Sequence, residues 1–214
     1  MLWSKPRGRG HPAARAETTA KAEKDMELER FLDALYDCPV VASVKEEAGL
    51  EQALASECRV VFLLFGDVVT LPAVVKRVRE SGKYALVHLD LVEGLAPREI
   101  AVDYLARKTE ADGIITTRPQ LARRAKSLGL LSLQRFFLLD SMAVENMRRQ
   151  LEQDTCDLIE VLPGCMPRVI RDVACSLAKP VIAGGLIRDK EDVTGALAAG
   201  AVAVSATSPE VWCF

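Results

Sequence analysis

The segment PVIAGGLIRDKEDVTGALAAGAVAVSATS, residues 180–208, contains a complete strand–helix–strand pattern. It begins with a short apolar run that ends in the glycine pair Gly184 and Gly185. Asp189 then precedes the helical pattern KEDVTGALAAG, which ends at Gly200, and a second apolar run follows at once. An aspartate before a helix and a glycine at its end are typical helix boundaries. The segment therefore predicts a β-strand, an α-helix and another β-strand in direct succession.

The same unit repeats along the chain. Apolar runs recur at intervals of 18 to 29 residues, beginning near Pro39, Val60, Tyr84, Gly113, Leu131, Asp157, Pro180 and Ala201. Continuous rather than alternating apolar character is typical of strands covered on both faces, as in a parallel sheet. Eight units in series favour a single compact (β/α)8 barrel of the TIM type. An open doubly wound sheet is less favoured, because no G-x-G-x-x-G motif follows the first strand.

The two ends of the predicted barrel domain, residues 26–214, are less regular. Only residues 209–214 follow the eighth strand, so we expect the eighth outer helix to be truncated or absent. The amphipathic segment MELERFLDALY, which begins at Met26, predicts an N-terminal helix over residues 26–36. We expect this helix, or else a partner subunit, to cover the seam between the first and eighth strands. A homo-oligomer is therefore compatible with the sequence.

Residues 1–25 differ in composition from the rest of the chain. They carry six Lys and Arg against three acids, a net charge of +3, so the remainder carries −5 of the total of −2. No period in this stretch could bury one face, and we expect a disordered basic extension. Such an extension could contact RNA or a membrane, or translation could start at Met26 instead.

The composition excludes several classes of protein. With 50% hydrophobic residues the chain is too apolar to be disordered, yet no apolar run reaches the roughly 18–20 residues of a membrane helix. Six cysteines include no C-x-x-C pair and are accompanied by only two histidines. We therefore expect reduced thiols in a cytoplasmic protein, and no metal site. The nearly balanced charge is unlike that of strongly basic nucleic-acid-binding domains.

The functional residues of a (β/α)8 barrel lie at the carboxyl ends of its strands. Gly184 and Gly185 end the seventh strand, while Ser205 and Thr207 lie on or after the eighth. Glycine backbone N–H groups beside hydroxyl groups suit a phosphate, and many such barrels bind phosphate at this position. The alternative is that the glycine pair only makes a tight turn. Lys45, after the first strand, is either a compensating charge for the phosphate or a solvated cation.

Four polar side chains interrupt or follow other predicted strands. His88 and Asp90 are two residues apart, which predicts that they share one face of the third strand. Arg135 and Glu160 lie within apolar runs of consecutive strands, and because an unpaired charge inside a barrel is costly, we expect them to pair. The pair is either structural or part of a ligand site. Asp140 is expected to cap the next helix. No lysine lies within a strand, so Schiff-base chemistry is not supported.

Six motifs together point to a known family. They are VHLDLVEG (87–94), DGIITTR (112–118), LQRFFLLD (133–140), DLIEVLPG (157–164), IAGGLIR (182–188) and GAVAVSATS (200–208). The chain resembles the glycerol uptake operon antiterminator regulatory proteins, in which these motifs recur in the same order. The resemblance covers roughly Pro39 to Trp212. The form FGDVV after the second strand and the basic extension lie outside the pattern.

The resemblance implies a TIM-barrel-like regulator without a cofactor that senses glycerol 3-phosphate. It implies binding to leader mRNA, which prevents premature transcription termination in genes of glycerol uptake and catabolism. No catalytic residue is implied. Carried over by motif, the ligand-site positions are His88, Asp90, Arg118, Arg135, Glu160, Gly164, Gly184, Gly185, Arg188, Ser205 and Thr207.

RNA binding by an acidic barrel would need a local basic surface. Two predicted helices, expected to be neighbours, carry five cations that could form one stripe or be solvated helix faces: Arg123, Arg124, Lys126, Arg148 and Arg149. Two other functions stay open. One is a small barrel enzyme acting on a three-carbon phosphate, with Glu160 or Asp90 as base and His88 as acid. The other is a metabolite-binding protein whose partner is another protein.

Overall fold

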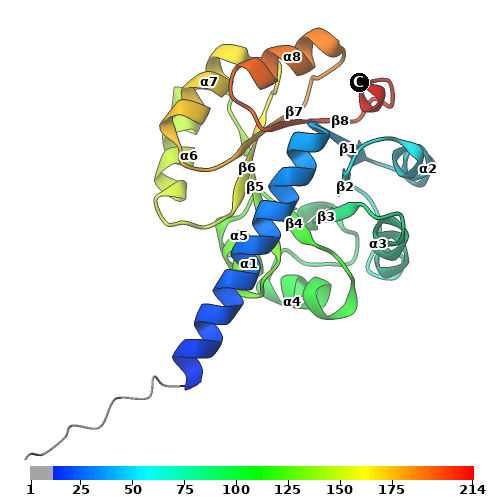
Figure 1. Cartoon of the computed structure of the whole chain (residues 1–214), viewed down its shortest axis with the longest axis vertical. Coiled ribbons are helices and arrows are strands. Elements are labelled where there is room, and N and C mark those ends of the chain that lie inside the picture. The colour runs from blue at the N-terminus through cyan, green and yellow to red at the C-terminus, as the bar shows by residue number, and fades with distance from the viewer. Residues whose placement is uncertain (1–11) are drawn as a thin grey trace, which may run out of the picture.

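The computed structural model describes residues 12–214, which form a closed barrel of parallel strands with helices outside it (Figure 1). Each strand pairs with the next in sequence, and the last pairs with the first. The strands are β1 (Val40–Val44), β2 (Val60–Leu63), β3 (Tyr84–His88), β4 (Gly113–Thr116), β5 (Leu131–Phe137), β6 (Leu158–Leu162), β7 (Val181–Gly184) and β8 (Ala203–Ala206). The predicted (β/α)8 fold is confirmed.

One helix follows each of the first seven strands. These helices are α2 (Glu47–Ala55), α3 (Leu71–Glu80), α4 (Glu99–Lys108), α5 (Pro119–Ser127), α6 (Ser141–Leu151), α7 (Pro167–Ser176) and α8 (Lys190–Ala198). The Asp140 carboxylate caps α6 by accepting a hydrogen bond from the Ala143 N–H at 2.8 Å, as predicted. Within residues 12–214, no helix has both the length and the apolar character needed to span a bilayer.

The end of the chain covers the seam between β8 and β1. Only the short 3-10 helix η2 (Val211–Cys213) follows β8, which confirms the truncated eighth helix. Trp212 is buried, and its indole N–H donates to the Ala206 carbonyl at 2.8 Å while η2 packs against β1. The covering role that the sequence predicts for the N-terminal helix therefore belongs to η2.

Strand alternation divides the apolar core into two layers. Outward-facing residues such as Val40 and Ala42 pack between the sheet and the helices. Inward-facing residues such as Val41, Phe62 and Leu86 fill the barrel. Toward the carboxyl ends of five strands the inward-facing residue is polar: Ser43 on β1, His88 on β3, Arg135 on β5, Glu160 on β6 and Ser205 on β8. The carboxyl end of the barrel interior is therefore built for polar contacts.

Helix α1 (Pro12–Asp37) closes the opposite, amino-terminal end of the barrel. Phe31 and Leu35 are fully buried in the inner layer, and the Phe31 ring meets the Tyr84 ring edge-on at 5.2 Å between centroids. The open barrel end exposes an apolar layer, which matches the apolar face of α1. For this reason α1 lies across the barrel end instead of on the β1–β8 seam (Figure 1).

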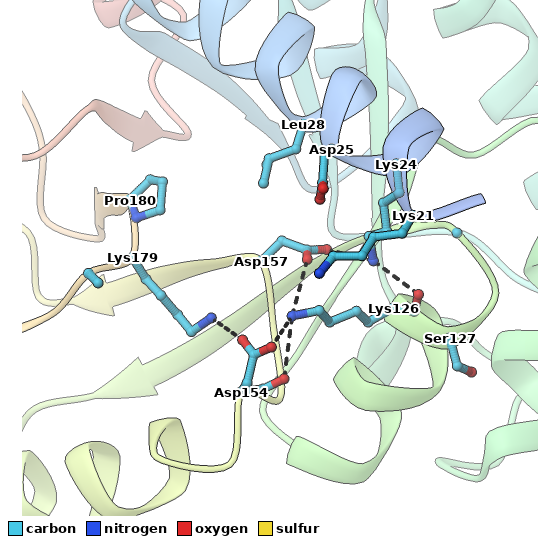
Figure 2. Close-up of a pocket in the computed structure, with 12 residues that line it drawn as sticks. Lys21, Lys24, Asp25, Leu28, Lys126, Ser127, Asp154, Asp157, Lys179 and Pro180 are labelled. Atoms are coloured by element: carbon cyan, nitrogen blue, oxygen red, sulfur yellow. Dashed lines mark hydrogen bonds and ion pairs between the residues drawn. The ribbon is translucent and has the colours of Figure 1, made fainter. Parts of the chain in front are cut away.

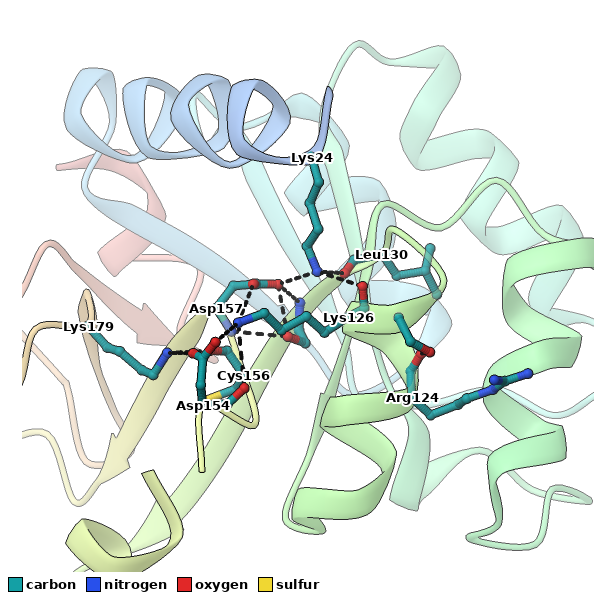
Figure 3. Close-up of polar contacts among 10 residues, drawn as sticks. Lys24, Arg124, Lys126, Leu130, Asp154, Cys156, Asp157 and Lys179 are labelled. Carbon is teal, nitrogen blue, oxygen red and sulfur yellow. Dashed lines mark hydrogen bonds and ion pairs between the residues drawn. The ribbon is translucent and has the colours of Figure 1, made fainter. Parts of the chain in front are cut away.

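Helix α1 begins well before the predicted start at Met26. The prediction of disorder is therefore wrong for residues 12–25, and residues 1–11 lie outside the described part of the chain. The stretch PAARAETTAKAEKD is rich in Ala, Glu and Lys, which favour helix. Lys24 attaches it to the barrel: its ammonium donates to the carbonyls of Lys126 and Leu130 at 3.0 and 3.2 Å, and lies 3.1 Å from the Asp157 carboxylate (Figure 3).

Candidate functional site

A cavity of about 380 Å³ opens at the carboxyl ends of the strands, chiefly β1 and β5–β8. Its wall contains both apolar and hydroxyl groups besides the predicted residues, among them Leu162, Ile187 and Ser208. Seven of the predicted ligand-site residues line it: Lys45, Arg135, Glu160, Gly185, Arg188, Ser205 and Thr207. The structure therefore brings these residues, which are far apart in the sequence, around one hollow.

An ion pair forms the floor of this cavity. The register of β5 and β6 places Arg135 opposite Glu160, with the Arg135 Nε 2.6 Å from Glu160 Oε2. Glu160 Oε1 accepts a hydrogen bond from the Ser205 hydroxyl at 2.5 Å. Glu160 is completely buried. The predicted pair is present, and both carboxylate oxygens of Glu160 are already engaged within the protein.

Glycines after β6 and at the end of β7 permit this close packing. A Cβ on Gly184 would collide with Glu160 Oε1 and lie 2.5 Å from the Ser205 hydroxyl oxygen. A Cβ on Gly164 would lie 2.9 Å from the backbone at Ala183. Gly185 and Leu186 both adopt positive φ, 75° and 60°, which is uncommon for leucine. The glycine pair does make a tight turn, and the same turn borders the cavity.

Lys45 and Arg188 give the cavity its positive charge. Both side chains are exposed, and within the described residues neither forms an ion pair with a carboxylate. The third cation, Arg135, is neutralised by Glu160. The Thr207 and Ser208 side chains add hydroxyl groups to the same wall. The wall thus offers close to two positive charges, which matches the charge of a phosphate monoester near pH 7.

His88 and Ser43 are buried near this site without hydrogen-bond partners. Within the described residues, His88 Nδ1 and the Ser43 hydroxyl make no hydrogen bond, although both residues are only 4% exposed. Burial, and then the positive charge of Arg135, lower the pKa of His88 to about 4, so its imidazole is neutral near pH 7. Because an unsatisfied buried polar group costs about 1–3 kcal/mol, the hydroxyl of Ser43, which lines the cavity, indicates a position where ligand or water binds.

The sequence prediction missed Ser43, and one signal could have found it. Side chains alternate along a strand, so Ser43 lies on the same face as Val41, the inward one. Ser43 also lies two residues before Lys45, and both line the cavity. A polar residue at the carboxyl end of a strand whose other inward-facing residues are apolar is therefore the sequence pattern that indicates a site residue.

Asp90 and Arg118 lie away from this cavity, between β3 and β4. Strand β3 ends at His88, and Asp90 lies in the 3-10 turn η1 (Leu89–Leu91), so the prediction of a shared strand face is wrong. Asp90 Oδ2 accepts hydrogen bonds from the Thr117 N–H at 2.8 Å and the Thr116 hydroxyl at 3.0 Å, and Oδ1 lies 3.4 Å from Arg118 Nε. The Asp90 carboxylate binds the loop after β4, and this contact holds the chain in a turn after His88.

The barrel as a whole matches a known family. A family model described as "Glycerol-3-phosphate responsive antiterminator" matches residues 40–212, which extend from the start of β1 into η2. The chain belongs to the glycerol-3-phosphate responsive antiterminator family. The resemblance inferred from the six sequence motifs is thereby confirmed.

Relatives of this antiterminator-family chain span nearly its whole barrel. "Uncharacterized protein YgcP" of Escherichia coli (strain K12) is 41% identical over 182 residues, which cover 85% of this chain and 95% of that protein. The crystal structure of the glycerol uptake operon antiterminator regulatory protein from Listeria monocytogenes is 34% identical with a TM-score of 0.79, covering 82% and 95%. A glycerol uptake operon antiterminator-related protein from Thermotoga maritima is 34% identical with a TM-score of 0.71, covering 81% and 96%.

A more distant likeness concerns the fold alone. Deoxyribose phosphate aldolase from Aeropyrum pernix superimposes with a TM-score of 0.62 but is only 16% identical, over 86% of this chain and 94% of that one. The strands of this antiterminator-family chain contain no lysine, as the sequence shows. Among the residues that the structure describes, no group of three or more His, Cys, Asp or Glu side chains is placed to hold a metal ion.

The cations predicted to bind RNA tie neighbouring segments of the antiterminator barrel together. Helix α5 packs against α4, where Arg124 donates to the Asp103 carboxylate at 2.6 and 3.0 Å. Arg123 donates to the side-chain carbonyl of Gln153 at 2.8 Å. These two arginines therefore have partners within the protein.

The remaining predicted cations are also mostly paired. The Lys126 ammonium lies 2.7 Å from Asp154 and 3.8 Å from Asp157, in a cavity at the amino-terminal end of the barrel (Figure 2). Arg149 lies 3.3 Å from Glu145 on the same helix. Arg148 is exposed on α6 and forms no ion pair within the described part of the chain. The five cations thus do not form one stripe of free charge.

Proposed function

We propose that this chain is a glycerol 3-phosphate-responsive RNA-binding regulator that controls transcription antitermination in genes of glycerol uptake and catabolism. One observation carries the proposal: Lys45 and Arg188, which have no carboxylate partner among the described residues, line a cavity beside the turn at Gly185 and the Thr207 hydroxyl. The family description names the same effector. We expect the chain to act in the cytoplasm, where the leader mRNA is transcribed.

The cavity offers distinct surroundings to the two ends of this effector. The phosphate would lie between Lys45 and Arg188, where the hydroxyls of Thr207 and Ser208 can donate hydrogen bonds to it. The glycerol hydroxyls would face the barrel interior. There the Ser43 hydroxyl lines the cavity, and the neutral His88 lies close to Arg135, so both have unused hydrogen-bonding capacity.

The geometry supports binding better than catalysis. Both oxygens of Glu160 are engaged by Arg135 and Ser205, so this carboxylate is poorly placed to remove a proton from a ligand. Asp90 is engaged by the loop after β4. His88 is a weak candidate for a general acid. Its pKa of about 4 leaves the imidazole neutral near pH 7, so the imidazolium form that would donate the proton is scarcely populated.

Calorimetry and thermal unfolding with glycerol 3-phosphate test the effector site. A ligand at 100 times its Kd adds about 2.7 kcal/mol to the free energy of unfolding, so the melting temperature should rise. Glycerol and inorganic phosphate should each bind more weakly. Lys45→Gln and Arg188→Gln should lower the affinity about tenfold each, while Arg171→Gln on α7 is the matched control outside the cavity. Unchanged melting at saturating effector would contradict the proposal.

Titration of leader RNA with and without the effector, at one stated salt concentration, tests regulation. A coupling of about 1–3 kcal/mol corresponds to a change of about 5- to 150-fold in RNA affinity. Equal affinity under both conditions rules regulation out. Arg148→Glu with Arg149→Glu tests the predicted RNA face on α6, and Arg107→Glu on α4 is the control. We expect the α6 pair to weaken RNA binding and to leave effector binding unchanged.

A further inference from the structure

We propose that the cavity at the amino-terminal end of the barrel is a second ligand site, for a phosphate monoester with a small apolar organic group. The cavity has a volume of about 630 Å³, within the usual range for small-molecule sites, and lies between α1 and the starts of β5, β6 and β7 (Figure 2). It opens at the opposite end of the barrel from the effector cavity, and no residue lines both.

The side chains that line this amino-terminal cavity carry an excess of positive charge. Four lysines come from α1, α5 and the loop before β7: Lys21, Lys24, Lys126 and Lys179. Three carboxylates leave a net charge of +1: Asp25, Asp154 and Asp157. Figure 2 shows Lys21, Lys126 and Lys179 pointing from different sides toward the two aspartates before β6. The excess charge favours an anionic ligand.

Lys24 and Asp157 are structural members of this set. The Lys24 ammonium has three N–H donors, and two carbonyls and the Asp157 carboxylate engage all of them (Figure 3). Asp157 also accepts hydrogen bonds from the Ser132 N–H at 3.0 Å and the Ser132 hydroxyl at 2.8 Å. Its side chain is only 4% exposed. These two residues hold α1 on the barrel and leave ligand binding to the other three lysines.

Lys21, Lys126 and Lys179 each keep at least one N–H donor for a ligand. Lys179 donates to Asp154 at 2.7 Å and to the Cys156 carbonyl at 2.6 Å. Lys126 has one close contact, at 2.7 Å to Asp154, and its next acceptor is 3.5 Å away. Within the described part of the chain, Lys21 makes no hydrogen bond or ion pair. Three ammonium groups match the three terminal oxygens of a phosphate monoester.

The Asp154 carboxylate already shows how two of these lysines share an anion. Its Oδ1 lies 2.7 Å from Lys179 Nζ and its Oδ2 2.7 Å from Lys126 Nζ, although its side chain is 69% exposed. The hydrogen bonds from these two ammonium groups lower the pKa of Asp154 to about 2. A phosphate beside Asp154 would meet the same two ammonium groups from the cavity side, and Lys21 would reach it from α1.

The remaining wall of the cavity selects the organic part of the ligand. Leu28 on α1 and Ala178 and Pro180 before β7 offer apolar surface, which suits an alkyl or aryl group better than the hydroxyls of glycerol. Asp25 faces the cavity from α1 (Figure 2), and its negative charge disfavours a second acidic group on the ligand. Phenyl phosphate has the expected features and serves as the probe.

The first test is calorimetry with phenyl phosphate on the full chain carrying Lys45→Gln and Arg188→Gln, which removes the free charge of the effector cavity. We expect one binding site, and inorganic phosphate should bind it about tenfold more weakly because it lacks the apolar group. Adding Lys21→Met or Lys179→Met should weaken phenyl phosphate binding about tenfold each. Arg30→Met, on α1 but outside this cavity, is the matched control and should leave the affinity unchanged.

The second test locates the bound ligand in the wild-type chain by hydrogen exchange. Phenyl phosphate would bridge α1 to α5 and to the loop before β7, so it should slow exchange of the α1 amides. Glycerol 3-phosphate in the effector cavity should leave α1 unchanged, and Lys21→Met should not alter its affinity. These two readouts distinguish failure of this site from failure of the effector site.

Three results would overturn the proposal. The first is no binding of phenyl phosphate to the chain with Lys45→Gln and Arg188→Gln, provided that thermal unfolding shows this variant to be folded. The second is equal binding of phenyl phosphate and sulfate, which would reflect attraction of any anion. The third is weaker leader RNA binding by Lys21→Met and Lys179→Met without any binding of phenyl phosphate, which would assign these lysines to RNA instead.

Discussion

Arg135 on β5 and Glu160 on β6 occupy the same position along the barrel axis and form a buried ion pair of 2.6 Å directly beneath the candidate effector cavity. Because Ser205 on β8 binds the second carboxylate oxygen, the contact links three strands. The ion pair therefore supports the barrel and shapes the floor of the site.

Replacing Glu160 with alanine should destabilise the barrel by about 3–5 kcal/mol, because it leaves the Arg135 charge buried and uncompensated. Urea unfolding measures this loss. The control is Glu110→Ala at an exposed position, which should change the free energy of unfolding by less than about 0.5 kcal/mol. Equal effects of the two substitutions would contradict a structural role for the pair.

Gly184→Ala should cost about 1–3 kcal/mol, because the added Cβ collides with Glu160 Oε1 and crowds the Ser205 hydroxyl. It should also weaken glycerol 3-phosphate binding, since the cavity floor must shift. Gly195→Ala on α8 is the matched control: its Cβ would make an ordinary contact at 3.6 Å, and alanine favours helix. We expect Gly195→Ala to be neutral or stabilising, and a loss of stability equal to that of Gly184→Ala would argue against the collision.

His88 should make folding less favourable in acid. Its pKa of about 4 in the folded chain lies below its ordinary value of 6.5, so the unfolded chain takes up the proton first as the pH falls. The contribution of neutral His88 to the free energy of unfolding is complete above pH 6.5 and is lost by about pH 4. The free energy of unfolding changes by about 3 kcal/mol over this range. It is measured as the difference between wild type and His88→Gln in urea unfolding from pH 7 to pH 4.

Asp112 supplies the control for this pH dependence because its effect has the opposite sign. Burial raises its pKa to about 6, so the folded chain takes up this proton first and gains stability as the pH falls from 6 toward 3.8. The free energy of unfolding of wild type relative to Asp112→Asn should therefore rise as the pH falls, whereas that of wild type relative to His88→Gln should fall. Parallel slopes for the two variants would contradict the assignment to His88.

Lys24→Met should loosen α1 from the barrel. The Lys24 ammonium contacts two carbonyls and the nearly buried Asp157 carboxylate, and losing these charge-assisted contacts should cost about 1–3 kcal/mol. Hydrogen exchange of the α1 amides should accelerate. Lys21→Met, at an exposed position of the same helix, should cost less than about 0.5 kcal/mol and leave the exchange unchanged. Equal exchange rates in both variants would show that Lys24 does not hold the helix.

Parts of the site could be predicted because they depend on local patterns. Arg135 and Glu160 interrupt apolar strands that are consecutive in the sequence. Because consecutive strands of a barrel are neighbours, the ion pair between these two side chains could be predicted. Asp90 could not be placed in this way. Its turn depends on hydrogen bonds to the loop after β4, and no spacing between residues 88 and 90 reveals that contact.

The sequence by itself determined the eight strands, their parallel order and the lack of a full-length helix after β8. Continuous apolar runs and helix boundaries are encoded over a few residues. Only the tertiary structure decided which end of the barrel α1 closes, where that helix begins and which cations are neutralised. These outcomes depend on contacts such as that of Lys24 with Leu130, between residues 106 positions apart. A periodic pattern shows which face of an element is apolar, whereas its partner is decided by the shape and charge of the surface that the rest of the chain presents.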